Sequence, residues 1–345
     1  MKILIIGGTG FISSRLTTLL IENGHQVTLL NRGLSNASYE DKYAVEHLTA
    51  DRSNTAEMKA NIEDRTFDVV YDFVAYTASD SSSAVDIFTG RTGQFIHCST
   101  ISVYMVSHQV DCPITEDQDQ GPLMEFWPQN PFGMQYGIDK RACEKVLWQA
   151  HRESGFPITM LRPTFASGPG DPVKRDYFWI ERLNDGGPLL IPGHGIHKFQ
   201  QVYVEDVAQV FFLAAGNSQA IGQAYNVSQA EENTLWEYLN ILGKLMGKTP
   251  EIASIAQENF DQLPLSYSHE GDVFPFNTRT DAIFSIEKIQ ADLNFRPTPL
   301  REWLGKTIAW YAAADRGHSN GYSRRTDEIE LAQQITSSSQ AADPC

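Results

Sequence analysis

Apolar runs of strand length alternate with amphipathic stretches along the first two-thirds of the chain. The runs are KILIIGG (2–8), HQVTLLNRG (25–33), FDVVYDFVAY (67–76), GQFIHCST (93–100) and FPITMLRPT (156–164). The first is followed by SRLTTLLIENG (14–24), an amphipathic stretch that ends at a glycine suited to a helix C-terminus. Short β-rich runs separated by helices predict an α/β fold with a doubly wound parallel sheet.

The alternation changes character twice. Residues 169–198 are rich in glycine and proline and interrupt it, and the βα pattern then resumes in FQQVYVEDVAQVFFLAAG (199–216) and QAYNVS (223–228). From about residue 229 the pattern is mainly helical, and the end of the chain is polar and rich in serine. We therefore expect a main domain of residues 1–168 and 199–228, a smaller C-terminal substrate lobe of residues 169–198 and 229–312, and a polar, mobile tail of residues 313–345.

Composition narrows the classes of partner. The chain has 345 residues, 41% of them hydrophobic, which is enough for one large domain or two smaller ones. Its 27 basic and 43 acidic residues give a net charge of −16, which repels phosphate backbones and argues against nucleic-acid partners. The opening MKILIIGG breaks into glycines after a short apolar run, so it fits a buried strand better than a signal peptide. No stretch approaches the roughly 18 apolar residues of a membrane span, so no membrane partner is expected.

The four cysteines indicate a reducing compartment. Cys98, Cys112, Cys143 and Cys345 show neither C-x-x-C spacing nor histidines at metal-ligand spacing. Reduced thiols in a cytoplasmic protein are therefore expected. The two histidines of GHGIH (193–197) have no nearby carboxylate or cysteine partner, so they predict a loop and not a metal site.

A glycine-rich turn directly follows the first apolar run. In GGTGFISS (7–14), Gly7 permits a tight turn and Gly10 allows the backbone to approach a pyrophosphate at the helix N-terminus. The third glycine position of such motifs is Ser13, whose small side chain still allows close helix–strand packing. This context predicts a dinucleotide site in a Rossmann domain.

The residues at the end of the second predicted strand indicate whether NAD or NADP is bound. A carboxylate that binds the ribose hydroxyls of NAD is usual there, whereas this chain has Asn31 and Arg32. Arg32 is placed to pair with a 2′-phosphate, so NADP is predicted, with NAD as the alternative because surface arginines are common. Asp51, in TADRSN, follows the next short strand and can reach the adenine amino group.

Several motifs in order resemble one family. They are GGTGFIS (7–13), ADRSN (50–54), CSTISVY (98–104), YGIDK (136–140), LRPTFASGPGD (161–171), VYVEDVA (202–208) and LNFRPTPLREWLGKTIAWY (293–311). The set resembles the extended short-chain dehydrogenase/reductases, the NAD(P)-dependent sugar epimerase/dehydratase family, over about residues 1–312. Any one motif is weak evidence, but the ordered set at the expected separations is specific.

The resemblance implies a catalytic set. Tyr136 is the general acid/base, and Lys140, one helical turn later, lowers the pKa of the tyrosine and binds the nicotinamide ribose. Thr100 supplies a hydroxyl to the reacting oxygen of the substrate, with Ser99 and Ser102 as competitors for that role and Ser99 the more structural of the two. Family members often form homodimers through the helix that carries Tyr136, so a homodimer is expected.

The resemblance also implies binding residues. The expected cofactor-binding residues are Gly7, Thr9, Gly10, Phe11, Ile12, Asn31, Arg32, Asp51, Arg52, Ala75, Tyr136, Lys140 and Pro163. The expected substrate-binding residues are Tyr76, Thr100, Thr164, Arg175 and Tyr177. A solvated charge at Arg175 and a packing role for Tyr76 stay open as alternatives.

Two departures from the family narrow the chemistry. The 4,6-dehydratases carry an Asp-Glu pair after the catalytic threonine, whereas this chain has Ile101 and Ser102, so a 4,6-dehydratase is disfavoured. Ala166 and Ser167 stand where many nucleotide-sugar epimerases place polar and aromatic residues, which leaves the substrate a sugar or a nucleotide sugar.

The function predicted is that of an NAD(P)-dependent oxidoreductase or epimerase acting on a sugar or nucleotide sugar. Two alternatives remain: an RNA-binding relative like the chloroplast stem-loop-binding proteins, and a sensor that binds NADP without turnover. The acidic charge argues against the first. The retained Tyr136 and Lys140 argue against the second.

Overall fold

The chain forms two compact units, each made of three segments. The computed structural model describes residues 1–34, 45–128, 130, 132–262 and 274–341. The first unit comprises Met1–Thr164, Val204–Ser228 and Phe284–Pro297, and the second comprises Phe165–Tyr203, Gln229–Ile283 and Thr298–Cys345.

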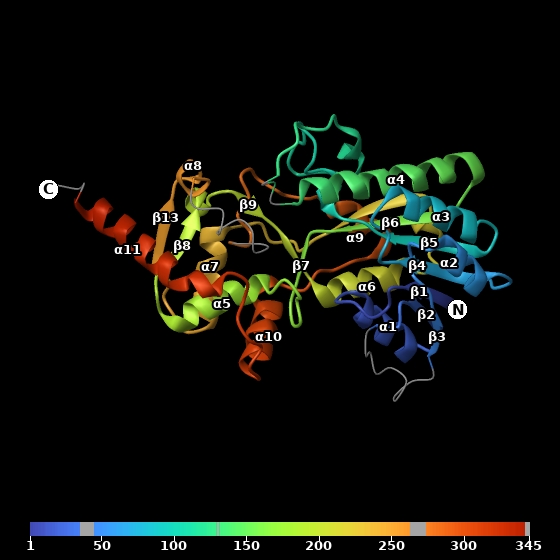
Figure 1. Cartoon of the computed structure of the whole chain (residues 1–345), viewed down its shortest axis with the longest axis horizontal. Helices are drawn as coiled ribbons and strands as arrows, with labels where there is room; N and C mark the ends of the chain where they lie inside the picture. The colour runs from blue at the N-terminus through green and yellow to red at the C-terminus, as the bar shows by residue number, and fades with distance from the viewer. Residues whose placement is uncertain (35–44, 129, 131, 263–273, 342–345) are drawn as a thin grey trace. The chain divides into compact units, whose positions relative to one another are not determined.

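A seven-stranded sheet forms the centre of the first unit (Figure 1). Its strands are β1 (Lys2–Ile6), β2 (Gln26–Asn31), β3 (Glu46–Thr49), β4 (Phe67–Asp72), β5 (Thr92–Cys98), β6 (Ile158–Pro163) and β11 (Gln223–Val227). All neighbouring strands are parallel, in the order β11-β6-β5-β4-β1-β2-β3. The order reverses between β1 and β4, so the carboxyl ends of these strands form the switch point at which doubly wound folds bind ligands. The predicted fold class is confirmed.

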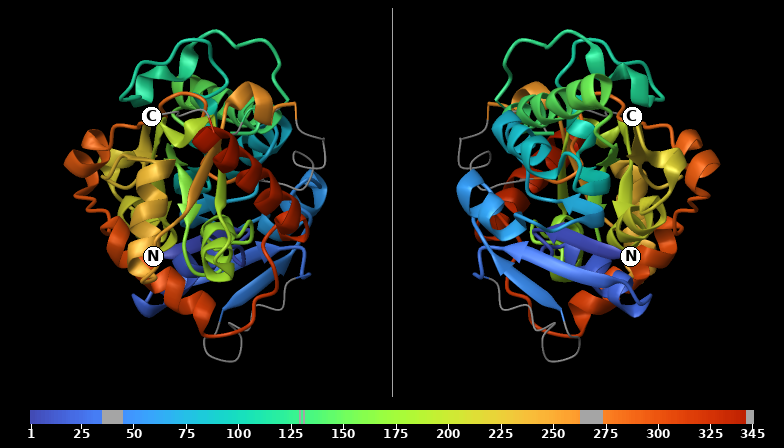
Figure 2. Two further views of the ribbon diagram at one scale, coloured as in Figure 1. Left: turned by 90° about the vertical axis from the view of Figure 1, so that its left-hand side faces the viewer. Right: turned by 90° about the vertical axis from the view of Figure 1, so that its right-hand side faces the viewer.

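Helices cover both faces of this sheet. Helix α1 (Ser13–Glu22) packs with α6 (Val204–Ala214) on one face, and α2 (Thr55–Ile62), α3 (Ala78–Phe88) and α4 (Met134–Ser154) cover the other (Figure 1). Helix α9 (Glu287–Leu293) packs against β11 and α6. Strand β3 forms one edge of the sheet and is drawn in blue (Figure 2). The central strands are buried on both faces: Ile3–Ile6 of β1 are all apolar, whereas β4, β5 and β6 also bury polar residues such as Asp72, His97 and Arg162.

The second unit has short two-stranded pairs and its own helices. The strand pairs are β7 (Phe165–Ser167) with β10 (Gln201–Tyr203), β8 (Leu189–Pro192) with β13 (Ile252–Ile255), and β9 (Lys198–Phe199) with β12 (Asn233–Thr234). The helices are α5 (Arg175–Asp185), α7 (Leu235–Leu245), α8 (Gln257–Phe260), α10 (Leu300–Ala312) and α11 (Arg325–Ala341). Phe199, Tyr238 and Phe276 pack their rings together in the core of this unit.

The unit boundaries differ from those drawn from the sequence. Residues 165–168 and 199–203 lie in the second unit, because β7 pairs with β10 there. Helix α9 lies in the first unit, because its partners are β11 and α6.

The end of the chain also differs from the mobile tail that was expected. Helix α11 packs on β8 and β13, and its Glu328 forms a buried ion pair with Arg182 of α5 at 2.7 Å. The sequence reads as solvated because this buried contact is made by charged residues. Residues 342–345, with Cys345, lie outside the described part of the chain. No described helix has the length and apolar character that crossing a membrane requires.

Candidate active site

The glycine turn lies between β1 and α1, beside the switch point. Gly7 has φ +85°, and a Cβ atom there would lie 2.6 Å from Cγ1 of Val74. A Cβ on Gly8 would lie 2.4 Å from Cδ2 of Leu29. The turn therefore needs glycine for its conformation at Gly7 and for close packing at both positions.

Ser13 connects the two sides of this turn. Its hydroxyl donates to the carbonyl of Gly7 at 2.6 Å and accepts from the amide of Gly10 at 2.9 Å. Gly10 is exposed, so a ligand can approach its backbone, and it lies just before the N-terminus of α1, where the helix dipole favours an anion. The turn, with Thr9, Phe11 and Ile12, thus fits the pyrophosphate of a dinucleotide.

Of the predicted cofactor residues at the ends of β2 and β3, Arg32 and Asp51 are exposed and Asn31 is half-buried. Asn31 accepts a hydrogen bond from the amide of Gly33 at 2.8 Å, and Arg32 next to it is exposed. The pKa of Asp51 is lowered, first by hydrogen bonds from Ser53 and to a smaller degree by the charge of Arg32. Arg32 and Asp51 are therefore neighbours at this edge of the sheet.

Arg52 lies inside the protein, unlike its neighbours. Its Nε and Nη2 atoms donate to one oxygen of Asp72 at 3.1 and 2.7 Å, and Nη1 donates to Ser83 at 2.9 Å. The guanidinium therefore forms an ion pair that joins the segment after β3 to the end of β4. The structure therefore gives the Arg52 side chain a structural position, in contrast to the cofactor contact expected from the sequence.

Helix α4 brings Tyr136 to the threonine that follows β5. A Cβ atom on Gly137 would lie 2.6 Å from the carbonyl oxygen of Ser102, so glycine allows the helix to approach this segment closely. The Tyr136 side chain lies close enough to the Thr100 hydroxyl for that hydroxyl to lower the pKa of the phenol, and Tyr136 remains 41% exposed. The phenol and the hydroxyl can therefore both reach one oxygen atom of a ligand.

The serines that flank Thr100 have other partners. Ser99 donates to Glu144 at 2.5 Å, and that carboxylate in turn binds the buried Arg162. Ser102 donates to the carbonyl of Phe132 at 2.8 Å. The Thr100 hydroxyl is also engaged, since it donates to the Ser102 hydroxyl and accepts from the Ser102 amide, both at 3.2 Å. These bonds are longer than those of the two serines, so Thr100 is the hydroxyl that a ligand can redirect most easily.

Lys140, four residues after Tyr136 on α4, is buried. Its Nζ atom lies 2.9 Å from the carbonyl oxygen of Ala75, 2.6 Å from that of Cys98 and 3.0 Å from Nε2 of His97. These acceptors follow β4 or belong to β5, so the cation sits at the carboxyl edge of the sheet. Its ammonium also lies 5.9 Å from the centre of the Tyr76 ring.

Burial dominates the proton affinities around the tyrosine. It raises the pKa of Tyr136, while the hydrogen bond with Thr100 lowers it. It raises the pKa of Cys98 to about 11, against a lowering by the charge of Lys140. Tyr76 also has a raised pKa, chiefly through burial. At neutral pH both phenols are protonated in this structure, so Tyr136 is a proton donor before it is a base.

The other candidate substrate residues fall into two groups. Thr164 directly follows β6 in the first unit, after Pro163, a predicted cofactor residue that ends the strand. The amide of Thr164 donates to the carbonyl of Val227 at 3.0 Å. Arg175 and Tyr177 belong to α5 in the second unit. There the ring of Tyr177 stacks on Tyr311 with 4.3 Å between centroids.

One residue at the site was missed from the sequence. His97 is fully buried in β5 and contacts Lys140, although it interrupts an apolar strand and resembles a core residue in sequence. A polar residue one position before the end of a buried strand was the available signal.

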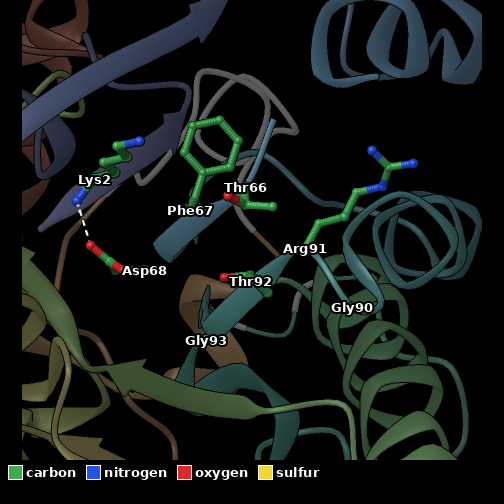
Figure 3. A pocket seen from close by; sticks show the side chains of 8 residues that line it. All are labelled: Lys2, Thr66, Phe67, Asp68, Gly90, Arg91, Thr92 and Gly93. Carbon is green, nitrogen blue, oxygen red and sulfur yellow. Dashed lines mark hydrogen bonds between the residues drawn. The ribbon is translucent and has the colours of Figure 1, made fainter. Parts of the chain in front are cut away.

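A surface hollow of about 410 Å³ lies elsewhere on the first unit (Figure 3). Lys2, Asp68, Thr92 and Gly93 line it, with Thr66, Phe67, Gly90 and Arg91. These residues lie at or before the amino ends of β1, β4 and β5. The hollow is thus at the edge of the sheet opposite the glycine turn and Tyr136.

Comparison with known proteins gives both sequence and structural matches. The model of the NAD dependent epimerase/dehydratase family matches residues 3–89 and 86–228. A chloroplast stem-loop binding protein of 41 kDa (form b) from Arabidopsis thaliana is 30% identical over 311 residues, covering 86% of this chain and 75% of that protein. A dTDP-glucose 4,6-dehydratase from Actinoplanes is 25% identical over 345 residues, covering 91% and 98%.

Solved structures share the fold at lower identity. The UDP-glucose 4-epimerase of Thermotoga maritima, solved with UDP-glucose, has a TM-score of 0.70 at 22% identity, covering 91% of this chain and 99% of that one. The dTDP-glucose 4,6-dehydratase of Bacillus anthracis, solved with NAD, has a TM-score of 0.71 at 18% identity, covering 91% and 97%.

Proposed function

The chain belongs to the NAD dependent epimerase/dehydratase family, and from this premise we propose that it is an NAD(P)-dependent oxidoreductase or epimerase acting on a sugar or nucleotide sugar. Family membership confirms the resemblance inferred from the motifs. The observation that carries the proposal is that Tyr136 lies close to Thr100, while the buried Lys140 ammonium donates to the carbonyl of Cys98, two residues before Thr100. Relatives named for nucleotide-sugar substrates support the substrate class.

In the proposed reaction, the chain's residues move one proton. The nicotinamide, when bound, accepts or gives the hydride. Tyr136 donates its phenolic proton to a carbonyl oxygen that is being reduced, or removes the proton from a hydroxyl that is being oxidised. Thr100 fixes that oxygen by a hydrogen bond. The positive charge of Lys140 stabilises the phenolate that remains, which offsets the effect of burial on the tyrosine.

NADP is the proposed preference, with NAD as the alternative. Of the two arginines expected at the adenosine end, Arg52 is paired with Asp72 and only Arg32 is exposed beside Asp51. A guanidinium there supplies two parallel donors to a phosphate. The family description names NAD, and the preference for NADP is proposed for this chain alone.

A 4,6-dehydratase reaction is not proposed, although named relatives carry it. Eliminating water needs an acid/base pair beside the proton-transfer residue. Here Ile101 is buried and apolar, and Ser102 is bound to the Phe132 carbonyl. This supports turnover without loss of water from the substrate.

The test is substitution of the tyrosine. Tyr136→Phe is expected to lower turnover of the sugar substrate about 10²–10⁴-fold, because the proton donor is lost. The dissociation constant of NADP(H) should stay within about twofold, since the phenyl ring keeps its packing. Tyr322→Phe, in the second unit, is the matched control. Undiminished turnover in Tyr136→Phe would refute the proposal.

A second measurement separates an epimerase from a net reductase. Cofactor retained through purification would favour an epimerase, and cofactor exchange would favour a net reductase.

An RNA-binding function is the second candidate, because the relative from Arabidopsis thaliana is named as a stem-loop binding protein. The net charge of −16 weighs against it.

We also propose a homodimer formed through α4, which analytical ultracentrifugation can test.

A further inference from the structure

His97 combines full burial with a polar contact to the candidate catalytic lysine. It lies in β5 with no exposed surface, and its Nε2 atom is 3.0 Å from Nζ of Lys140. Its other ring nitrogen, Nδ1, has no hydrogen-bond partner among the described residues. Buried polar atoms are nearly always paired, so an imidazole kept in the core for a single contact needs an explanation.

The number of N–H donors on the Lys140 ammonium explains this contact. A lysine ammonium has three N–H donors and no acceptor. In this structure three acceptors surround Nζ of Lys140: the carbonyl oxygens of Ala75 and Cys98 and the Nε2 atom of His97. The two carbonyls belong to the backbone and are present whatever the sequence. His97 is the one side chain among these three acceptors.

We propose that His97 is a positioning residue for Lys140: its neutral imidazole, protonated at Nδ1, accepts the third ammonium proton and fixes the cation at the Cys98 carbonyl, two residues before Thr100. The proposal rests on the proposed function, which gives Lys140 its role beside the tyrosine. It deepens that function, because a fixed cation stabilises the phenolate through its charge at a constant distance. A ribose hydroxyl bound at Lys140 must share or replace one of the three acceptors.

The surroundings keep the imidazole neutral. Burial holds the pKa of His97 well below its usual range, and the charges of Lys140, Arg52 and Arg162 lower it further. Asp72 on the neighbouring strand β4 is next to His97 in register, but its carboxylate is bound to Arg52. The Nε2 lone pair therefore stays available to the ammonium at neutral pH.

The first test observes the tautomer and needs no substrate. In ¹⁵N-histidine NMR of the whole protein, the His97 signal, assigned by its loss in His97→Gln, should show protonation at Nδ1 alone at pH 7. A ring protonated at Nε2, or at both nitrogens, overturns the proposal. In Lys140→Met the pKa of His97 should rise by about one unit or more, because the adjacent cation is gone. An unchanged His97 titration would also contradict the proposal.

The second test measures the consequence for catalysis. His97→Leu should lower kcat about tenfold, leave KM within about twofold and move the pH optimum upward, because the cation is less fixed. His97→Gln places an amide oxygen near the Nε2 position and should recover most of kcat. His108→Leu, at an exposed histidine, is the control. Equal kcat values in His97→Leu and His97→Gln would reject the positioning role. A correct tautomer in a protein without turnover would instead reject the proposed function alone.

Discussion

The dinucleotide preference depends on a single exposed side chain, Arg32. Because Arg52 is paired with Asp72, it cannot replace Arg32 at a 2′-phosphate without breaking a buried ion pair. We predict that Arg32→Ala weakens NADPH binding about 10- to 100-fold, the usual range for lost charge-assisted hydrogen bonds, and changes NADH binding less than about twofold. Fluorescence titration measures both constants. Arg301→Ala, another exposed arginine, should change neither. Equal NADPH affinity in Arg32→Ala and the wild type would exclude the assignment.

A second prediction concerns Asp176, a carboxyl group buried in the second unit. Burial raises its pKa from 3.8 to about 6, although hydrogen bonds from Tyr238 and Gln201 lower it. The folded state therefore binds more protons than the unfolded state between about pH 4 and 6. Stability should fall as the pH rises through this window, by an amount on the order of 3 kcal/mol.

The measurement compares Asp176→Asn with the wild type by thermal unfolding from pH 4 to pH 7. The amide cannot ionise, so the melting temperature of the variant relative to the wild type should increase with pH by several degrees. Asp327→Asn, at an exposed position, is the control and should show no such trend. A difference in melting temperature that does not change with pH would show that Asp176 does not titrate in this range.

At the scale of elements, α11 is held to the second unit by charged contacts. Glu328 and Arg182 are both almost fully buried and share two hydrogen bonds, of 2.8 and 2.7 Å. Glu328→Ala leaves the buried Arg182 guanidinium without its carboxylate partner, although its hydrogen bonds to Phe178 and Ser319 remain. The free energy of unfolding should therefore fall by about 3–5 kcal/mol. Glu330→Ala, on an exposed position of the same helix, should change stability by less than about 0.5 kcal/mol. Chemical denaturation measures both, and equal effects would show that the ion pair does not hold the helix.

The elements that the sequence predicted are those with a local signal. The strands of the large sheet are short apolar runs between helices, and the first helix follows a glycine turn, so periodicity and turn chemistry suffice for both. The pairs β7–β10 and β8–β13 join segments far apart in the chain, and no local pattern specifies such partners. Helix α11 escaped prediction because its buried face includes the charged residues Arg325 and Glu328, which a hydrophobic pattern assigns to solvent.

The candidate site shows the same division. The Tyr-x-x-x-Lys spacing and the glycine turn are local, and the structure brings Tyr136 close to Thr100. The buried position of Arg52 and the contact of His97 with Lys140 depend on strand neighbours, β4 and β5, and on α4. Such contacts arise only once the sheet has formed, so the sequence alone could not assign them.

At the scale of the whole molecule, the acidic charge separates the two candidate functions. Sequence-independent RNA binding depends on neutralising phosphates, and a net charge of −16 opposes it. We predict that a stem-loop RNA binds this chain more weakly than about 100 µM at 150 mM salt, the weak end of non-specific binding. NADPH binding should be retained under the same conditions, because it depends on the glycine turn and not on the overall charge. Gel-shift titration over a range of salt concentrations is the measurement. Micromolar, salt-sensitive binding that NADPH displaces would place RNA at the dinucleotide site and favour the second candidate.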